Sequence, residues 1–321
     1  MDALIVIGLL VLTLLLISCF APRPRLNAKP LLTRVPRDLT HRELANWLYA
    51  EETSVGEVIE GAEACIFWAS KPKRTELSVL YIHGFSASRQ EISPVPEAIS
   101  EALSANLVCA RLAGHGLNTK PMQASAEDWL QSLTDAWQIA SSIGNKVIII
   151  AVSTGAPLGI WLTQHPSNRI ALHSLLFMSP NFRVRHPFGF ILTWPWAEVW
   201  IPKLLGEERS WEPDNELVAR YWSHRYSINA LIEMQKVVDW VRHTKLDSHN
   251  IPLATFYMTG DPTISHEAAI SFHEAWRSKS KELFEVTIDP GNIQHVFTGN
   301  ISAPQRVDWT VEVCLAFIRS I

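Results

Sequence analysis

The sequence has 321 residues, of which 47% are hydrophobic and 19% are charged, and its formal net charge is −4. This balance excludes a globally disordered chain and argues against a general nucleic-acid binder, because phosphate contacts need clustered Lys and Arg. The four cysteines are scattered without a CxxC pair, so neither a zinc site nor a disulfide framework is indicated. The length suits one large α/β domain with an insertion, or two small domains.

The N-terminal segment at residues 3–21 carries no charged side chain and is long enough to cross a bilayer as a helix. A signal peptide is the weaker reading, because Asp2 stands where Lys or Arg is expected. Basic residues between 23 and 37 follow, so the positive-inside rule predicts a single-pass anchor and a cytoplasmic domain. Residues 16–19, LISC, resemble a bacterial lipobox, which leaves open a lipoprotein anchored through Cys19. Both readings predict a membrane tether within residues 1–21.

Prolines among basic residues make 22–40 an expected exposed linker, and residues 41–321 the folded domain. In that domain, apolar runs alternate with helical patterns, which is typical of a mainly parallel sheet covered by helices. We expect strands at 65–68, 77–82, 107–112, 147–152, 172–178, 253–258 and 284–288.

One helix has a clear start at Ser125, because Asp128 three residues later completes a capping box. Trp129, Leu133 and Trp137 then recur every four residues and give this helix an apolar face.

The alternation stops between about 181 and 246, where no strand fits and only a helix near 228–241 is expected. This segment is rich in Trp and Pro, and we interpret it as an inserted lid. Trp194 and Trp196 are candidates for lining the substrate site. The alternatives are that they belong to an aromatic core or touch a bilayer, since Trp favours the membrane interface.

The pentapeptide AVSTG at 151–155 follows an expected strand and precedes an expected helix at 156–164. A Ser on such a tight turn projects its hydroxyl beyond the sheet, and small residues two positions before and after it avoid clashes. The usual pattern is G-x-S-x-G, and Ala151 departs from it. Ser153 is therefore the candidate nucleophile, supported by its position more than by the pentapeptide itself.

The partners of such a Ser follow it in the order acid, then His. Asp261 comes just after the expected strand at 253–258, and His295 lies in the loop after 284–288. His295 would act as the base, and Asp261 would orient it. Asp289 is an alternative acid and His266 an alternative base.

Acyl transfer also needs two N–H donors where negative charge develops on the substrate oxygen. One is expected from Thr154, after the nucleophile, and the other from Phe85 in the loop that begins His83-Gly84-Phe85. His83 is expected to bond to loop backbone and not to take part in the chemistry.

Over residues 60–320 the sequence resembles the α/β-hydrolase superfamily, and within it serine hydrolases similar to monoacylglycerol lipases and lysophospholipases. The resemblance rests on HGF at 83–85, GHG at 114–116, EDW at 127–129, the pentapeptide at 151–155, Gly260-Asp261 and the His295 loop.

The resemblance implies hydrolysis of carboxylic esters, often of lipid character, on an acyl or lipid substrate and without a cofactor. A peptidase or amidase on the same three residues is the first alternative. The second is a non-catalytic binding protein of this fold, which predicts the loss of one of the three. A metal site is not expected, because the sequence contains no HExxH motif and no paired cysteines. The sequence indicates no oligomeric state.

Overall fold

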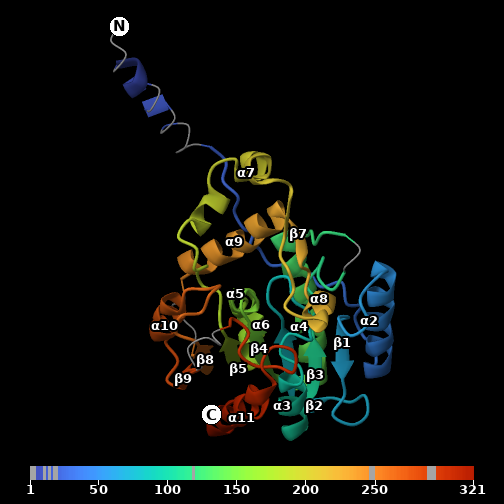
Figure 1. Ribbon diagram of the computed structural model, residues 1–321. Coiled ribbons are helices and arrows are strands. Elements are labelled where there is room, and N and C mark those ends of the chain that lie inside the picture. The colour runs from blue at the N-terminus through green and yellow to red at the C-terminus, as the bar shows by residue number, and fades with distance from the viewer. Residues whose placement is uncertain are drawn as a thin grey trace.

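The computed structural model describes residues 5–9, 12, 13, 16, 21–117, 120–245, 250–287 and 294–321. A seven-stranded sheet lies at its centre (Figure 1), with the strand order β1-β3-β2-β4-β5-β8-β9. β1 pairs antiparallel with β3, and the other neighbours are parallel. The expected mainly parallel sheet is thereby confirmed. Its strands are β1 Cys65–Phe67, β2 Thr75–Ile82, β3 Asn106–Cys109, β4 Gly144–Val152, β5 Leu172–Met178, β8 Leu253–Tyr257 and β9 Lys281–Glu285.

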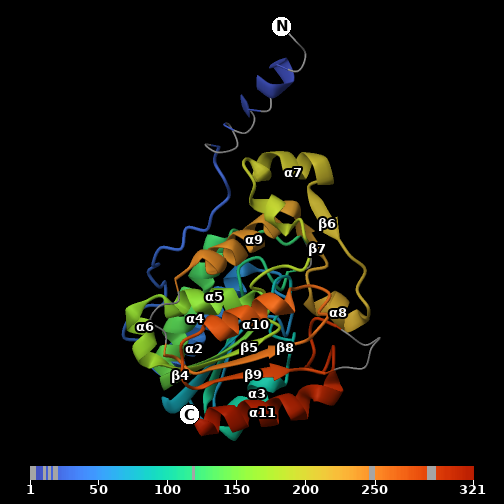
Figure 2. The same cartoon turned by 90° about the vertical axis from the view of Figure 1, so that its left-hand side faces the viewer.

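Helices cover both faces of this sheet, which Figure 2 shows nearly edge-on. One face carries α3 (Val95–Ala102) and α11 (Val307–Ser320), and the other carries α4 (Ala126–Ile143), α5 (Gly155–Thr163) and α10 (His266–Ala275). Successive side chains of β4 alternate between the two resulting apolar cores, as the period of a strand requires. Burial on both faces explains why residues 147–152 of β4 form an unbroken apolar run. The remaining elements outside the insertion are α2 His41–Val55, α6 Pro166–Ala171 and η2 Pro304–Arg306.

The strand order reverses direction between β2 and β4. The chain goes from β2 outward to β3, then returns to place β4 on the other side of β2. At such a switch point the connections leave on opposite faces and open a crevice beyond the carboxyl ends of the strands. Ile82 pairs with Ala151 there, so the residues that follow β2 and β4 lie side by side.

β9 differs from the expected strand at 284–288, because it occupies Lys281–Glu285, and Ile288 lies outside the described residues. It is an edge strand whose side chains are exposed or half-buried. Three of its five residues are charged, and the apolar pair Leu283-Phe284 lies between them, so the strand lacks the apolar run that marks a buried strand.

The segment between β5 and β8 contains two short strands that the sequence did not indicate. They form an antiparallel pair of three residues each, outside the main sheet, and are too short to show a pattern. In both views α7 lies at the end of the molecule opposite α11. The inserted elements are η1 Gly189–Thr193, α7 Ala197–Leu205, β6 Glu208–Ser210, α8 Glu216–Tyr221, β7 Arg225–Ser227 and α9 Ile228–His243.

Part of residues 22–40, whose composition predicts an exposed linker, packs against the folded domain. The Trp161 indole donates to the carbonyl of Ala28 at 3.0 Å, and Val35 is buried. Asp135 of α4, itself buried, accepts from the Arg34 amide at 2.6 Å and from the Arg34 guanidinium at 2.7 Å. This part of the segment therefore belongs to the folded body.

The N-terminal apolar segment is only partly described, and Cys19 lies outside the described residues. Within the portions of the chain that the structure describes, no helix is both long enough and apolar enough to span a membrane.

Replacing Ser125 by Ala should lower the free energy of unfolding by about 1 kcal/mol, because the first turn of α4 loses its cap. The Ser125 hydroxyl accepts from the Asp128 amide, and the Asp128 carboxylate accepts from the Ser125 amide. Ser141→Ala, on the same helix, is the matched control and should change stability by less than about 0.5 kcal/mol. Urea denaturation followed by circular dichroism measures both, and equal stabilities would contradict the role of the cap.

Candidate active site

Ser153 lies on a strained turn directly after β4. Its backbone φ is 50°, a left-handed conformation that non-glycine residues rarely adopt. Two hydrogen bonds hold the turn, from the Ser153 amide to the Met178 carbonyl and from the Asn181 amide to the Ser153 carbonyl, both at 3.0 Å. Such strain persists only where the surrounding structure enforces it, and it clusters at functional sites.

The neighbours of Ser153 must be small because β2 runs close by. A Cβ atom at Gly155 would lie 2.5 Å from the carbonyl oxygen of Ile82, so this position requires Gly. Ala151 is fully buried within β4, between Ile82 and Phe177 on the flanking strands. A single methyl group is accommodated there, which accounts for the departure from the usual pattern.

Ser153, His295 and Asp261 form a continuous hydrogen-bonded chain. Nε2 of His295 lies 2.8 Å from the Ser153 hydroxyl, and Nδ1 of His295 lies 2.8 Å from Oδ2 of Asp261. Oδ1 of Asp261 accepts from the amides of Thr263 and Ile264, which locks the carboxylate in place. The three candidates come from loops after β4, β8 and β9, and the fold brings all three together.

The surroundings of these three side chains favour an ionised Asp261 paired with a protonated His295. Burial raises the pKa of Asp261, but the His295 charge, the hydrogen bond to His295 and the two backbone amides outweigh it and lower that pKa below its ordinary value. Burial lowers the pKa of His295, and the charge and hydrogen bond of Asp261, with a smaller contribution from Glu91, raise it above its ordinary value. His295 is thus a base whose protonated form is stabilised.

Two backbone amides are available next to Ser153. In the described part of the chain, neither the Phe85 amide nor the Thr154 amide donates to another protein group. Thr154 is buried and precedes the first turn of α5, where the helix dipole favours negative charge. Both predicted donors are therefore in the state that an oxyanion hole needs.

His83 orients the first of these amides. Its Nε2 accepts from the Leu112 amide at 3.2 Å, so the proton lies on Nδ1, which donates to the Gly84 carbonyl at 2.9 Å. The carbonyl and amide of a trans peptide point in opposite directions, so this bond also fixes the direction of the Phe85 N–H. Burial lowers the pKa of His83 to about 4, which keeps the ring neutral.

The sequence reasoning missed three buried polar residues at this site. The Asn181 amide group donates to the Thr154 hydroxyl at 3.2 Å, and the Ser179 hydroxyl donates to the His295 carbonyl at 2.9 Å. Both lie just after β5, at a strand end that carries no recognisable sequence motif. The third, Glu91, has no local sequence pattern that would single it out.

A role of Trp194 and Trp196 in lining the substrate site stays a prediction. Both side chains are 46% exposed, and Trp196 caps the start of α7 at the outer end of the insertion. Of the alternative partners, Asp289 lies outside the described residues. His266 stacks on Tyr257 at the start of α10, and the position beside Ser153 belongs to His295.

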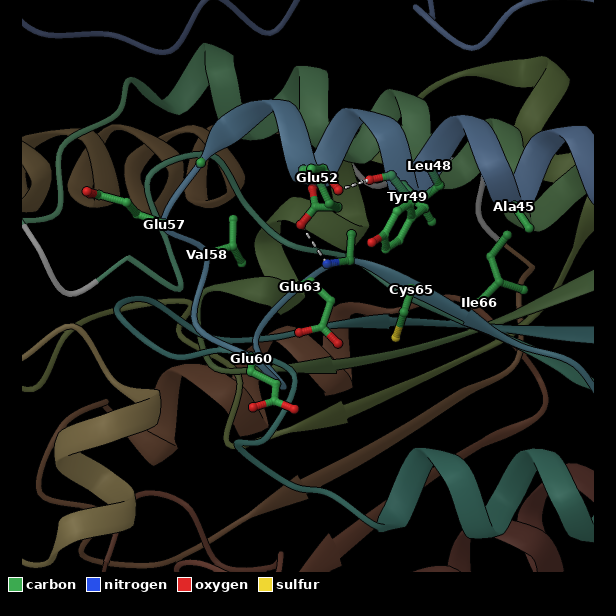
Figure 3. A pocket seen from close by; sticks show the side chains of 13 residues that line it. Ala45, Leu48, Tyr49, Glu52, Glu57, Val58, Glu60, Glu63, Cys65 and Ile66 are labelled. Carbon is green, nitrogen blue, oxygen red and sulfur yellow. Dashed lines mark hydrogen bonds between the residues drawn. The ribbon is translucent and has the colours of Figure 1, made fainter.

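A hollow of about 610 Å³ lies between α2 and β1, away from Ser153 (Figure 3). Its two best-buried carboxylates have structural partners: Glu52 pairs with Arg111 and accepts from the Ala64 amide, and Glu63 pairs with Arg89. These bonds hold α2 and the start of β1 against the sheet. Among the residues placed by the structure, no cluster of three or more His, Cys, Asp or Glu side chains could hold a metal ion.

Comparison with known proteins agrees with this geometry. No family model matches the sequence. A thermostable monoacylglycerol lipase from Bacillus sp. (strain H-257) is 28% identical over 110 residues, and this alignment spans 34% of the chain and 41% of that lipase. A metagenome-derived lipolytic enzyme superposes with a TM-score of 0.64 at 20% identity, covering 82% of this chain and all of the other.

The monoacylglycerol lipase of Paleococcus ferrophilus superposes with a TM-score of 0.58 at 15% identity, over 80% of this chain and 98% of that one. The strand order, the turn at Ser153 and these superpositions all indicate the same fold. The chain has the α/β-hydrolase fold, in a form similar to that of monoacylglycerol lipases.

Proposed function

We propose that this protein is a serine hydrolase that cleaves carboxylic esters of lipid character through an acyl-enzyme on Ser153. The observation that carries the proposal is the hydrogen-bonded chain from Ser153 through His295 to the buried Asp261, at the end of a strained turn. A non-catalytic protein of this fold has no need to maintain that strain together with all three side chains.

In the acylation step, His295 removes the proton from the Ser153 hydroxyl as the oxygen attacks the ester carbonyl. The developing oxyanion accepts hydrogen bonds from the amides of Phe85 and Thr154. His295 then gives its proton to the leaving alcohol, and the acyl group remains on Ser153. Asp261 holds the Nδ1–H tautomer and stabilises the imidazolium while it exists.

In the deacylation step, water takes the place of the alcohol. His295 removes a proton from the water, the hydroxide attacks the acyl carbonyl, and the same two amides stabilise the second oxyanion. The proton returns to Ser153 as the carboxylic acid leaves. In both steps His295 and Ser153 accept and return every proton that is transferred, so the proposed reaction requires no cofactor.

An apolar cluster beside the His83–Phe85 loop, which carries the proposed oxyanion donor Phe85, supports an acyl substrate. Phe85 packs edge-on against Tyr226 with ring centroids 5.3 Å apart, and the same cluster includes Met122, Trp211, Ala230 and Leu231. The insertion is tied to the same loop, since the Ser223 amide donates to the Ser86 carbonyl at 2.6 Å. We infer that the insertion serves as a lid that shelters an acyl chain. The similarity to monoacylglycerol lipases supports the same substrate class.

Membrane attachment is the second part of the proposal. The outer end of the insertion exposes large apolar side chains, and the Trp196 amide donates to the Pro22 carbonyl, just after the apolar segment at 3–21. An exposed apolar patch next to an apolar anchor suits a lipid surface. We propose that the segment anchors the protein with its domain in the cytoplasm. A lipoprotein anchored through Cys19 is the alternative. The exposed side chains are Phe188, Phe190, Trp194, Trp196, Val199, Leu204 and Leu205.

A fluorophosphonate probe should label the wild-type protein, and Ser153→Ala should abolish both the labelling and the hydrolysis of short-chain p-nitrophenyl esters. Loss of the nucleophile is expected to reduce kcat by on the order of 10⁴-fold or more. Peptide mapping of the labelled protein locates the adduct. Labelling elsewhere would contradict the proposal, and faster cleavage of a matched p-nitroanilide would favour an amidase.

Asp261→Asn should reduce kcat on the order of 10³- to 10⁴-fold, because His295 then loses the partner that sets its tautomer. Wild-type kcat/KM should fall on the acid side with an apparent pKa above the ordinary His value of about 6.5, since only neutral His295 accepts the proton. The variant removes the charge that raises this pKa, so its acid limb should move to lower pH. An unchanged profile would transfer the role to Asp289.

Deleting residues 2–21 should leave an active enzyme that no longer sediments with membranes. Deleting residues 2–37 instead should lower the melting temperature, because Asp135 then loses its hydrogen bonds from Thr33 and Arg34 and the apolar core loses Val35. Sedimentation with lipid vesicles and thermal melting separate the two variants. If the shorter deletion still sediments fully, the outer end of the insertion and not the N-terminal segment is the main attachment.

A further inference from the structure

Glu91 is a buried carboxylic acid directly behind the oxyanion loop. It is 2% exposed and lies between β2 and α3, eight residues after His83. Its Oε2 accepts from the Gly84 amide at 2.7 Å and from the Tyr81 hydroxyl at 3.3 Å. A buried carboxyl group is costly, so a fold retains one only where its bonds or its charge have a use.

Glu91, Gly84 and Ser153 are packed in direct succession. A Cβ atom at Gly84 would lie 2.8 Å from Oε1 of Glu91 and 3.1 Å from Cβ of Ser153. Both peptide groups that flank Gly84 are held: its amide by Glu91 and its carbonyl by His83. The second of these peptides carries the Phe85 N–H. Glu91 and His83 therefore clamp one oxyanion donor from two sides.

The charge of Glu91 acts on the base of the reaction. Burial raises the pKa of Glu91 to about 7, while the Gly84 amide and the His295 charge favour its ionised form. Conversely, the Glu91 charge adds to that of Asp261 in raising the pKa of His295. The imidazolium that forms during acylation thus lies in the field of two carboxylates, only one of which it contacts.

Other titratable groups around Glu91 do not replace it in this role. Burial raises the pKa of Tyr81 well above its ordinary value, so the phenol stays neutral and donates to Glu91. The hydrogen bond to Cys65 and burial raise the pKa of Cys109 on the neighbouring strand, which keeps that thiol neutral. Among the described residues, Glu97 on α3 accepts from the Ser93 hydroxyl and has no hydrogen bond to Ser153, His295 or Asp261.

We propose that Glu91 is a positioning residue of this site: its carboxylate clamps the Gly84–Phe85 oxyanion loop, and its charge stabilises the His295 imidazolium together with Asp261. This inference rests on the proposed ester hydrolysis. It differs from a purely structural role, in which the carboxyl group only satisfies the Gly84 amide and the Tyr81 hydroxyl.

The test compares Glu91→Gln, Glu91→Ala and the control Glu97→Gln in the full chain. Gln keeps an acceptor for the Gly84 amide but removes the charge, whereas Ala removes both. Glu97→Gln removes a nearby carboxylate that has no part in the clamp. For each variant we would measure the melting temperature, kcat and KM on a short-chain p-nitrophenyl ester, and kcat/KM against pH.

Glu91→Gln should melt close to wild type, lose about tenfold in kcat with little change in KM, and shift its acid limb to lower pH. The sign follows from the lost negative charge, which had raised the pKa of His295. Glu91→Ala should lose about a hundredfold in kcat, because the oxyanion loop is also released. Glu97→Gln should keep the wild-type kcat and profile.

Wild-type kcat and pH profile in Glu91→Gln would overturn the inference. So would loss of folding in both Glu91 variants, because that result assigns Glu91 a structural role. The proposed function is tested separately by fluorophosphonate labelling of the wild type. No label on Ser153 would remove the proposed function and this inference together, whereas normal labelling with wild-type-like Glu91 variants would remove the inference alone.

Discussion

The parallel pairing of β2 with β4 is the constraint on which the site depends. The register that sets Ile82 opposite Ala151 places His83 and Gly84 beside Ser153, one step beyond the ends of the two strands. Close approach of these strand ends leaves no room for a Cβ atom at Gly155, and the side chains of Glu91 and Ser153 crowd the same position at Gly84. The backbone hydrogen bonds of the sheet thus bring the proposed oxyanion donors and the proposed nucleophile together, before any side chain contributes.

Around this frame, the site is held by polar groups buried in a region of low dielectric. Asp261 is fully buried, yet both of its carboxylate oxygens are satisfied, by His295 and by two backbone amides. Such a network is rigid because breaking any of its hydrogen bonds would leave a buried polar group without a partner, which is energetically unfavourable. His83 and Glu91 apply the same principle to the oxyanion loop. Buried hydrogen bonds therefore fix the positions of these groups, and in the proposed reaction the transition state would meet groups that need not reorganise.

Where local pattern and tertiary packing agree, the expectations drawn from sequence match the structure well. β5 has the expected bounds, and α4 begins at the expected cap, because both depend on neighbours within a few residues. The expectations differ from the structure where contacts between distant segments determine the conformation. The composition of residues 22–40 is that of a linker, but Asp135 and Trp161, more than 100 residues away, hold part of that segment against the body. The inserted strands β6 and β7 exist only as a pair.

The sequence alone was sufficient to predict a mainly parallel α/β sheet, the strand-to-helix turn at Ser153, and the order in which an acid and a His follow it. These features follow from the spacing of hydrophobic residues and from the positions of motifs, both of which can be read from the sequence. Only the tertiary structure brought Asp261 and His295, 34 residues apart, to within 2.8 Å of each other, because loops after different strands meet at one sheet edge. It alone placed Glu91 behind Gly84, since a buried charge is recognised by what surrounds it and not by its neighbours along the chain.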